Sequence, residues 1–178
     1  MKKLILGSAI LAVLGVASNA MAAPNTGTVN FTGSVSTATC DVALKDNAGG
    51  DIANVNLGVL SNTATANGTA VPFKLVPQDA TCLAKTSANV SWSSSTLAAA
   101  GITNAATAGT NAYLLVSTTN ATQTGTAAVI KQGQTSFDYS NTQGGIKSFD
   151  YSAVLAKPTA ALTAGPFSAS ATYVVTYK

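Results

Sequence analysis

The residues of this chain that could take part in chemistry are two cysteines and six aspartates, because the 178-residue sequence contains no histidine, arginine or glutamate. Without histidine, neither a histidine-based catalytic triad nor a histidine metal site can form. Catalysis by paired carboxylates would need two aspartates, and the candidates are Asp138 and Asp150, which share Phe-Asp-Tyr surroundings. In a strand, both side chains would point away from their aromatic neighbours and towards water. We therefore predict that the protein is not an enzyme.

Sites for metals, cofactors and nucleic acids are not indicated either. Asp41, Asp46 and Asp51 lack the spacing and the closing glutamate of a calcium-binding EF-hand loop. The chain has no phosphate-binding loop and no dinucleotide fingerprint. Outside its first 22 residues the chain has seven lysines and six aspartates, whereas nucleic-acid binding needs clustered basic residues. We predict no metal, no cofactor and no nucleic-acid partner.

The first 22 residues have the pattern of a secretory signal peptide. A basic start precedes an apolar run over residues 4–17, and small residues follow. The run is shorter than the roughly 20 apolar residues that a membrane-spanning helix needs. Cleavage after Ala22 fits the small-residue rule and avoids Pro24 as the first mature residue. We expect residues 1–22 to be removed and the rest of the chain to be exported.

Cys40 and Cys82 are the only two cysteines, and both would belong to the exported chain. A disulfide is the default for two cysteines in an oxidising compartment, whereas a cysteine metal site would need further ligands. Closing a loop of about forty residues would stabilise the fold by roughly 4 kcal/mol in the chain-entropy model. The sequence therefore predicts a bond between Cys40 and Cys82.

The last fourteen residues have the clearest strand pattern in the chain. After Gly165 and Pro166, which mark the start, apolar residues alternate with mostly polar ones up to the C-terminus. A period of two with aromatic and β-branched residues is typical of a half-buried strand. One face of this predicted strand carries Phe167, Ala169, Ala171, Tyr173, Val175 and Tyr177.

Residues 25–36 alternate in the same way, but with glycine at two positions of one face. Glycine weakens the interior of a strand and often marks close approach to another backbone or side chain. Composition alone is compatible with a glycine-tolerant edge strand. The face in question carries Gly27, Val29, Phe31, Gly33 and Val35.

The segments between these two strands predict an all-β fold. Short apolar stretches recur about every ten residues and are joined by turns rich in glycine, asparagine and serine, which favours a β-sandwich. The sequence Ser-Phe-Asp-Tyr-Ser occurs twice and predicts two related strands about a glycine turn, while Trp92 is expected in the core. Strands are predicted over residues 39–44, 52–60, 70–77, 88–93, 112–117, 127–132, 136–140 and 148–155, with turns or loops over 45–51, 96–110 and 118–126.

Taken together, these features resemble the chaperone–usher pilins. That family has a glycine fourteenth from the C-terminus, alternating apolar residues after it and a penultimate tyrosine, which correspond to Gly165, to residues 167–175 and to Tyr177. The signal peptide, the alternating N-terminal segment and the two cysteines extend the resemblance over essentially the whole chain. It implies that residues 37–178 form an immunoglobulin-like β-sandwich that is incomplete and is completed by a donor strand.

The resemblance also implies how the subunits assemble. Residues 23–36 would be an N-terminal extension whose Gly27, Val29, Phe31, Gly33 and Val35 fill pockets of a neighbouring pilin subunit. The C-terminal strand would be an exposed edge, engaged first by a periplasmic chaperone and then by the next subunit, with an outer-membrane usher as a further partner. We expect a structural subunit of an adhesive fimbria at the cell surface. The implied contacts on the edge are Gly165, Phe167, Ala169, Ala171, Tyr173, Val175 and Tyr177.

Two other functions stay open at this point. One is a carbohydrate-binding adhesin: a single domain is short for a tip adhesin, but a shaft subunit can also carry receptor sites. Lys131 and Lys147 would then be the candidate contacts for a host glycan. The other is a minor adaptor or terminator subunit, which abundance in purified fibres would distinguish from a major subunit.

Overall fold

The computed structural model describes residues 27–31 and 40–178, so the predicted signal peptide lies outside the described residues. Most of the regular structure is β-strand, as the alternating sequence predicts. One short α-helix and one short 3₁₀ helix interrupt the strands. The elements are β1 (Gly27–Phe31), β2 (Val42–Asp46), β3 (Asn54–Asn56), β4 (Val71–Pro77), α1 (Ala80–Leu83), β5 (Ser87–Ser93), β6 (Leu97–Ala98), β7 (Gly101–Thr103), β8 (Tyr113–Thr118), η1 (Gly125–Ala128), β9 (Ser136–Ser140), β10 (Phe149–Ala156) and β11 (Phe167–Tyr177).

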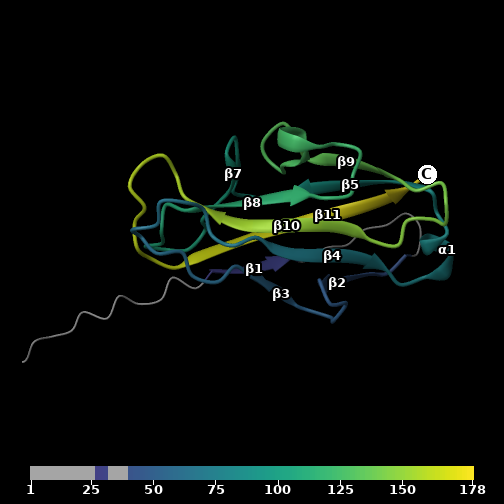
Figure 1. Ribbon diagram of the computed structural model, residues 1–178, viewed down its shortest axis with the longest axis horizontal. Helices are drawn as coiled ribbons and strands as arrows, with labels where there is room; N and C mark the ends of the chain where they lie inside the picture. The colour runs from purple at the N-terminus through teal and green to yellow at the C-terminus, as the bar shows by residue number, and fades with distance from the viewer. Residues whose placement is uncertain (1–26, 32–39) are drawn as a thin grey trace, which may run out of the picture.

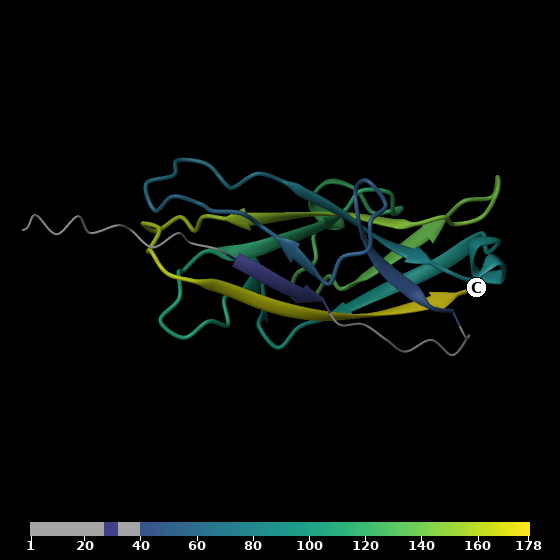
Figure 2. The same ribbon diagram turned by 90° about the horizontal axis from the view of Figure 1, so that it is seen from below.

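The strands form two sheets that pack face to face (Figures 1 and 2). The first sheet has the order β3-β1-β11-β5-β9, and the second has the order β2-β4-β10-β8-β7-β6. Among the described strands, β1 and β11 form the one parallel pair, and the other pairs are antiparallel. This arrangement confirms the predicted all-β sandwich. The helix α1 lies at the end of the molecule where the C-terminus also lies.

Alternating burial along the long strands explains why the two sheets pack together. In β10 the aromatic and aliphatic side chains from Phe149 to Leu155 are buried at every second position, and in β4 Phe73 and Leu75 are fully buried. Each strand therefore presents one apolar face to the opposite sheet, and burial of that face supplies the main driving force for folding. The single tryptophan, Trp92, is buried in this core as predicted.

Aromatic rings link the two sheets across the core. Trp92 of the first sheet contacts Tyr151 of the second edge to face, with ring centroids 5.1 Å apart. Tyr139 of the first sheet contacts Phe149 of the second in the same manner, at 4.8 Å. Burial raises the pKa of Tyr139 to about 12 because the phenolate would lose its hydration.

The two cysteines form the predicted disulfide. Cys40 precedes β2 and Cys82 lies in α1, and their Cα atoms are 6.1 Å apart. The bond therefore ties the start of β2 to the helix that follows β4. Next to it, the backbone N–H of Asp41 donates to a carboxylate oxygen of Asp79 at 3.0 Å, which holds the same two segments together.

Several predicted boundaries were wrong. The strand expected over residues 52–60 is reduced to Asn54–Asn56, and Lys45 and Asp46, expected in a turn, end β2 instead. The strand expected over residues 127–132 is absent from the described structure, where Gly125–Ala128 is a 3₁₀ helix followed by isolated bridges. The loop predicted over residues 96–110 contains the small hairpin of β6 and β7.

The two copies of the Ser-Phe-Asp-Tyr-Ser repeat form related strands, as predicted, but they lie in different sheets. The first copy is β9, at the edge of the first sheet, and the second begins one residue before β10, in the interior of the second. The prediction that both aspartates point outwards is only partly correct, because one carboxylate oxygen of Asp150 is buried without a hydrogen-bond partner among the described residues. No helix within the described residues is long and apolar enough to span a membrane.

Candidate functional site

The feature of the fold that could accept a partner is the flank of β11. This strand changes neighbours halfway along its length: β1 pairs with Phe167–Ala171 on one side, and β5 pairs with Thr172–Tyr177 on the other. Within the residues that the structure describes, pairing on the β1 side stops at Ala171. Figure 2 shows β1 and β11 side by side in the same sheet.

The backbone of β11 points its hydrogen-bonding groups alternately to its two flanks. The backbone oxygen of Ser168 accepts from the backbone N–H of Ala105 at 2.7 Å, and the oxygen of Ser170 accepts from the Ser94 hydroxyl at 2.7 Å, both on the β5 side. The backbone N–H of Lys178 donates to the backbone oxygen of Ser87 on that side as well. Because strand residues alternate, the backbone groups of odd-numbered residues face the β1 side.

Those odd-numbered residues also supply the buried face of the strand. Phe167, Ala169, Ala171, Tyr173 and Val175 are each at most 8% exposed, and Tyr177 is partly buried. The intervening residues are exposed. The predicted two-faced strand is therefore confirmed, with the same residues on the core side.

The described part of the N-terminal segment occupies a slot between two strands of its own chain. β1 runs antiparallel to β3, with Val29 opposite Val55, and parallel to β11, with Val29 opposite Ala169. Gly27 lies opposite Phe167, and Phe31 opposite Ala171. Removing β1 would leave β3 and β11 about two strand spacings, roughly 10 Å, apart. Gly33 and Val35 lie outside the described residues.

This pairing corrects one expectation. The resemblance implied that the C-terminal strand is an exposed edge, whereas β11 lies in the interior of the first sheet because β1 of the same chain pairs with its first half. The edge on that side is β3, a strand of three residues. Sequence patterns do not identify such partners, because main-chain pairing is independent of side-chain identity.

The start of β11 is fixed by close packing and by one asparagine. Gly165 has a φ of 151°, and a Cβ at this position would come within 2.8 Å of the backbone of Gly109 and Thr110. The side chain of Asn104 accepts a hydrogen bond from the backbone N–H of Ser168 and donates one to the oxygen of Pro166. Gly165 thus has a structural role in its own chain, and Asn104 is a positioning residue that the sequence pattern did not reveal.

The far end of β11 carries two tyrosines with perturbed hydroxyl groups. The hydroxyl of Tyr173 donates to the backbone oxygen of Val42 at 3.4 Å, and burial raises its pKa. The hydroxyl of Tyr177 is buried without a hydrogen-bond partner among the described residues. Burial, together with the nearby carboxylate of Asp79, raises the pKa of Tyr177 to about 12.

The two lysines proposed as glycan contacts have different surroundings. Lys147 is exposed, donates to the backbone oxygen of Leu83 at 3.2 Å and lines a hollow of about 140 Å³. Lys131 lies in a tight turn in which its backbone pairs with Gln134, and it does not line that hollow. The other residues that line the hollow are Asn120, Tyr139, Ser140, Asn141, Ile146 and Ser148.

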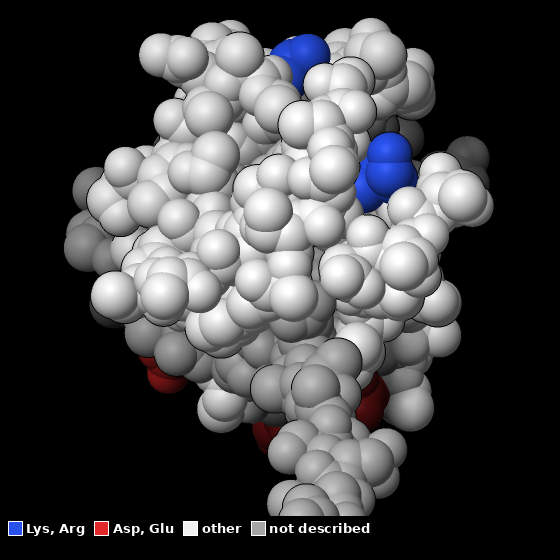
Figure 3. All heavy atoms as spheres, turned by 90° about the vertical axis from the view of Figure 1, so that its left-hand side faces the viewer, with Lys and Arg blue, Asp and Glu red and all other residues white. Residues whose placement is uncertain are grey.

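Charge is sparse on the described surface. Figure 3 shows the end opposite α1, where uncharged side chains dominate. Two ion pairs are present among the described residues: Lys45 with Asp51 at 2.7 Å, and Lys178 with Asp138 at 3.4 Å. The Lys45 side chain is partly buried, and the other three side chains are exposed. No residue of β11 itself is charged, so its flank offers main-chain hydrogen bonds and apolar contacts.

Comparison with known proteins identifies the kind of molecule that has this flank. Residues 29–178 match the family described as fimbrial protein. The chain belongs to the fimbrial protein family. It is also 36% identical to the K99 fimbrial protein of Escherichia coli over 187 aligned residues, which cover 99% of both chains.

As a fimbrial protein, the chain is a structural subunit that polymerises with other pilin subunits into a cell-surface fimbrium, and its family is structural and not enzymatic. The matched region begins within β1 and includes every later strand of the described sandwich. The signal peptide, the cleavage site and the boundary at residue 36 remain predictions, because they lie outside the described residues.

Proposed function

We propose that this fimbrial subunit polymerises by donor-strand exchange after secretion through the chaperone–usher route. In this proposal residues 23–36 of one subunit enter the slot between β3 and β11 of the next and take the place of that subunit's own β1. A periplasmic chaperone covers the flank of β11 before assembly, and an outer-membrane usher organises the exchange.

The observation that supports the proposal best is the position of β1. It is a single short strand held between β3 and β11, and it precedes the disulfide that begins the rest of the sandwich. Its pairing with β11 is parallel, which is slightly less stable per residue than antiparallel pairing. A strand from a second subunit can form main-chain hydrogen bonds of the same kind, which is the physical basis of β-strand addition.

The proposed contact would be directional. The donor segment lies at one end of the sequence and the receiving slot is a different surface, so the same contact can be repeated by each added subunit. Such a head-to-tail contact propagates into a filament and does not close into a dimer. The absence of charged side chains from β11 fits an interface held by apolar and main-chain contacts.

The decisive experiment substitutes the bulky residue of the proposed donor. We expect Phe31→Asp to abolish fibres in electron micrographs of cells, while the subunit still copurifies with its chaperone. Asn30→Asp is the matched control, because it places the same charge on the other face of the same strand. Normal fibres from the Phe31→Asp variant would contradict the donor assignment.

A separate experiment tests the chaperone contact. Tyr177→Ala should reduce recovery of the subunit from the periplasm, because it removes an aromatic residue from the proposed chaperone-binding face. Thr176→Ala, on the exposed face of β11, is the control. Equal recovery of the two variants would exclude Tyr177 as a chaperone contact.

A second candidate function is favoured by the hollow beside Lys147. Hydroxyl, amide and ammonium groups line it, as a sugar-binding site requires, and its volume of about 140 Å³ suits part of one sugar ring. We expect glycan binding by the purified monomer, measured on immobilised glycans, to be lost in Lys147→Ala and kept in Lys85→Ala, an exposed control. Equal binding by parent and variant would reject this site.

A further inference from the structure

β9 is the edge strand of the first sheet on the side opposite to β3. On the β5 side of this strand, the backbone oxygen of Thr135 accepts from the N–H of Trp92, and the N–H of Asn141 donates to the backbone oxygen of Thr86. By strand alternation, the backbone groups of Ser136, Asp138 and Ser140 face away from β5. An unpaired edge of this kind is a template for pairing with another chain.

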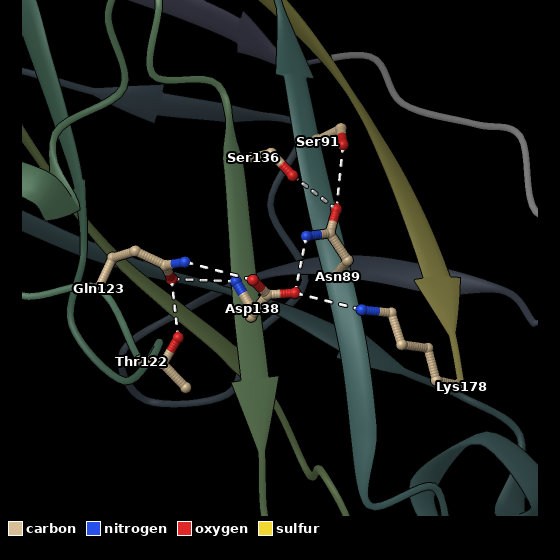
Figure 4. A network of polar contacts seen from close by, with 7 residues as sticks. All are labelled: Asn89, Ser91, Thr122, Gln123, Ser136, Asp138 and Lys178. Atoms are coloured by element: carbon tan, nitrogen blue, oxygen red, sulfur yellow. Dashed lines mark hydrogen bonds and ion pairs between the residues drawn. The ribbon is translucent and has the colours of Figure 1, made fainter.

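The central position of this edge is already occupied by a loop of the same chain (Figure 4). The backbone N–H of Asp138 donates to the side-chain oxygen of Gln123 at 3.0 Å, and its backbone oxygen accepts from the N–H of Thr122 at 2.8 Å. The Thr122 hydroxyl donates to the same Gln123 oxygen at 3.1 Å. Thr122 and Gln123 thus satisfy the donor and the acceptor that an added strand would use.

The second copy of the repeat is held in the same way. The backbone N–H of Asp150 donates to the side-chain oxygen of Asn120 at 2.8 Å, and its backbone oxygen accepts from the N–H of Thr119 at 2.9 Å. The Thr-Asn and Thr-Gln dipeptides of one loop therefore bind the two aspartates of the sequence repeat. Asp150 lies next to the end of β8, inside the second sheet, whereas Asp138 lies at an edge where another strand could pair.

Side chains around Asp138 hold this arrangement in place. One carboxylate oxygen accepts from the amide of Asn89 at 3.0 Å and contacts the ammonium of Lys178 at 3.4 Å. The other accepts from the amide of Gln123 at 3.4 Å. The hydrogen bond from Asn89, followed by those from Gln123 and Lys178, holds the pKa of Asp138 below its usual value.

We propose that the outer edge of β9 is a second strand-pairing surface, that Gln123 keeps it closed, and that its occupant when open is β9 of a second copy of this chain. The sequence of β9, Ser-Phe-Asp-Tyr-Ser, is nearly the same in both directions, so two antiparallel copies place Phe137 opposite Tyr139 and Asp138 opposite Asp138. The repulsion between the two carboxylates is offset because each contacts the ammonium of its own Lys178 at 3.4 Å. This contact is isologous and closes at two subunits. The loop therefore restricts strand addition to the flank of β11.

The test uses the mature chain with Gln123→Ala, compared with Gln143→Ala, an exposed glutamine in another loop. At high dilution, hydrogen exchange of the Asp138 amide should become about tenfold faster in the first variant, because one hydrogen bond is lost. In sedimentation velocity, its dimers should form at about tenfold lower concentration than those of the parent. The Gln143→Ala variant should match the parent in both measurements.

A further pair of substitutions locates the contact. Adding Ser136→Asp and Ser140→Asp to the Gln123→Ala chain places like charges on both sides of Asp138, which should return the protein to a monomer. Dimers that persist in this variant would overturn the proposal, as would a Gln123→Ala chain that stays monomeric with unchanged amide exchange. Gln123→Met, which keeps the side-chain length without the acceptor, should behave like Gln123→Ala. Because the predicted product is a dimer and not a ladder of oligomers, the outcome is independent of the donor-strand proposal.

Discussion

Trp92 donates a hydrogen bond from its indole nitrogen to the hydroxyl of Tyr151 at 3.1 Å, across the interface between the two sheets. Both residues are buried, at 4% and 1% exposure. Tyr173 of β11 packs against the same tryptophan, with ring centroids 5.6 Å apart. The strand that the assembly proposal depends on is therefore joined through Trp92 to the opposite sheet.

Tyr151→Phe should lower the free energy of unfolding by about 1–3 kcal/mol, because the indole N–H of Trp92 would stay buried without its acceptor. Urea denaturation followed by tryptophan fluorescence measures this change. Tyr113→Phe is the control, since Tyr113 is only partly buried, and it should change stability by less than about 0.5 kcal/mol. Equal effects of the two substitutions would show that the hydrogen bond contributes nothing specific.

Gly165→Ala should destabilise the subunit by about 1–3 kcal/mol or more, because the new methyl group would overlap the backbone of Gly109 and Thr110. Gly144→Ala is the matched control: its φ is also positive, at 133°, but a Cβ there meets no atom within 4 Å. Thermal unfolding of the two variants separates steric overlap from backbone strain. A smaller effect at Gly165 than at Gly144 would contradict the packing role.

The sequence pattern predicted the faces of the strands well. In β11 the alternation alone identified the buried residues from Phe167 to Val175, because a period of two places alternate side chains on opposite faces. The disulfide was also predictable, since an exported chain with two cysteines has one way to pair them. These features depend on local pattern or on composition, and both can be read without knowledge of the fold.

Pairing partners could not be predicted in this way. Nothing in residues 27–31 indicates that they pair with β3 and β11, because backbone hydrogen bonds are available to any strand. The predicted strand over residues 127–132 failed for a related reason: Val129 and Ile130 have strand propensity, but the turn at Gly125 and the 3₁₀ helix come first. The repeat of Ser-Phe-Asp-Tyr-Ser was visible in the sequence. The loop residues 119–120 and 122–123, which bind the backbones of its two aspartates, were identified only from the structure.

Replacing both Cys40 and Cys82 by serine should destabilise the subunit by about 4 kcal/mol in the chain-entropy model, because the bond closes a loop of 42 residues in the unfolded chain. Urea denaturation of the purified variant and of the parent measures the difference. The parent in reducing buffer is the control and should shift in the same direction. A variant with unchanged stability would indicate that the segment from Cys40 to Asp41 is held by other contacts, such as the Asp79 hydrogen bond.

Stability should fall between about pH 10 and pH 12 because buried tyrosines resist ionisation. The pKa of Tyr139 is raised to about 12 in the folded chain, mainly by burial, against 10.0 for an unperturbed tyrosine. Below pH 10 both states keep the proton and the contribution is complete. Above pH 10 the unfolded chain ionises first, so the contribution is lost as the pH rises through the folded value.

For the mostly buried Tyr139, a shift of this size corresponds to roughly 2–3 kcal/mol between neutral pH and pH 12. Urea denaturation at about pH 8, 10, 11 and 12 would measure the decline. The Tyr139→Phe variant, which has no ionisable group at this position, should lose less stability over that range than Tyr113→Phe, the partly buried control. A decline of the same size in both variants would mean that Tyr139 ionises equally easily in the folded and unfolded chains, and that its hydroxyl is not shielded from water by the core.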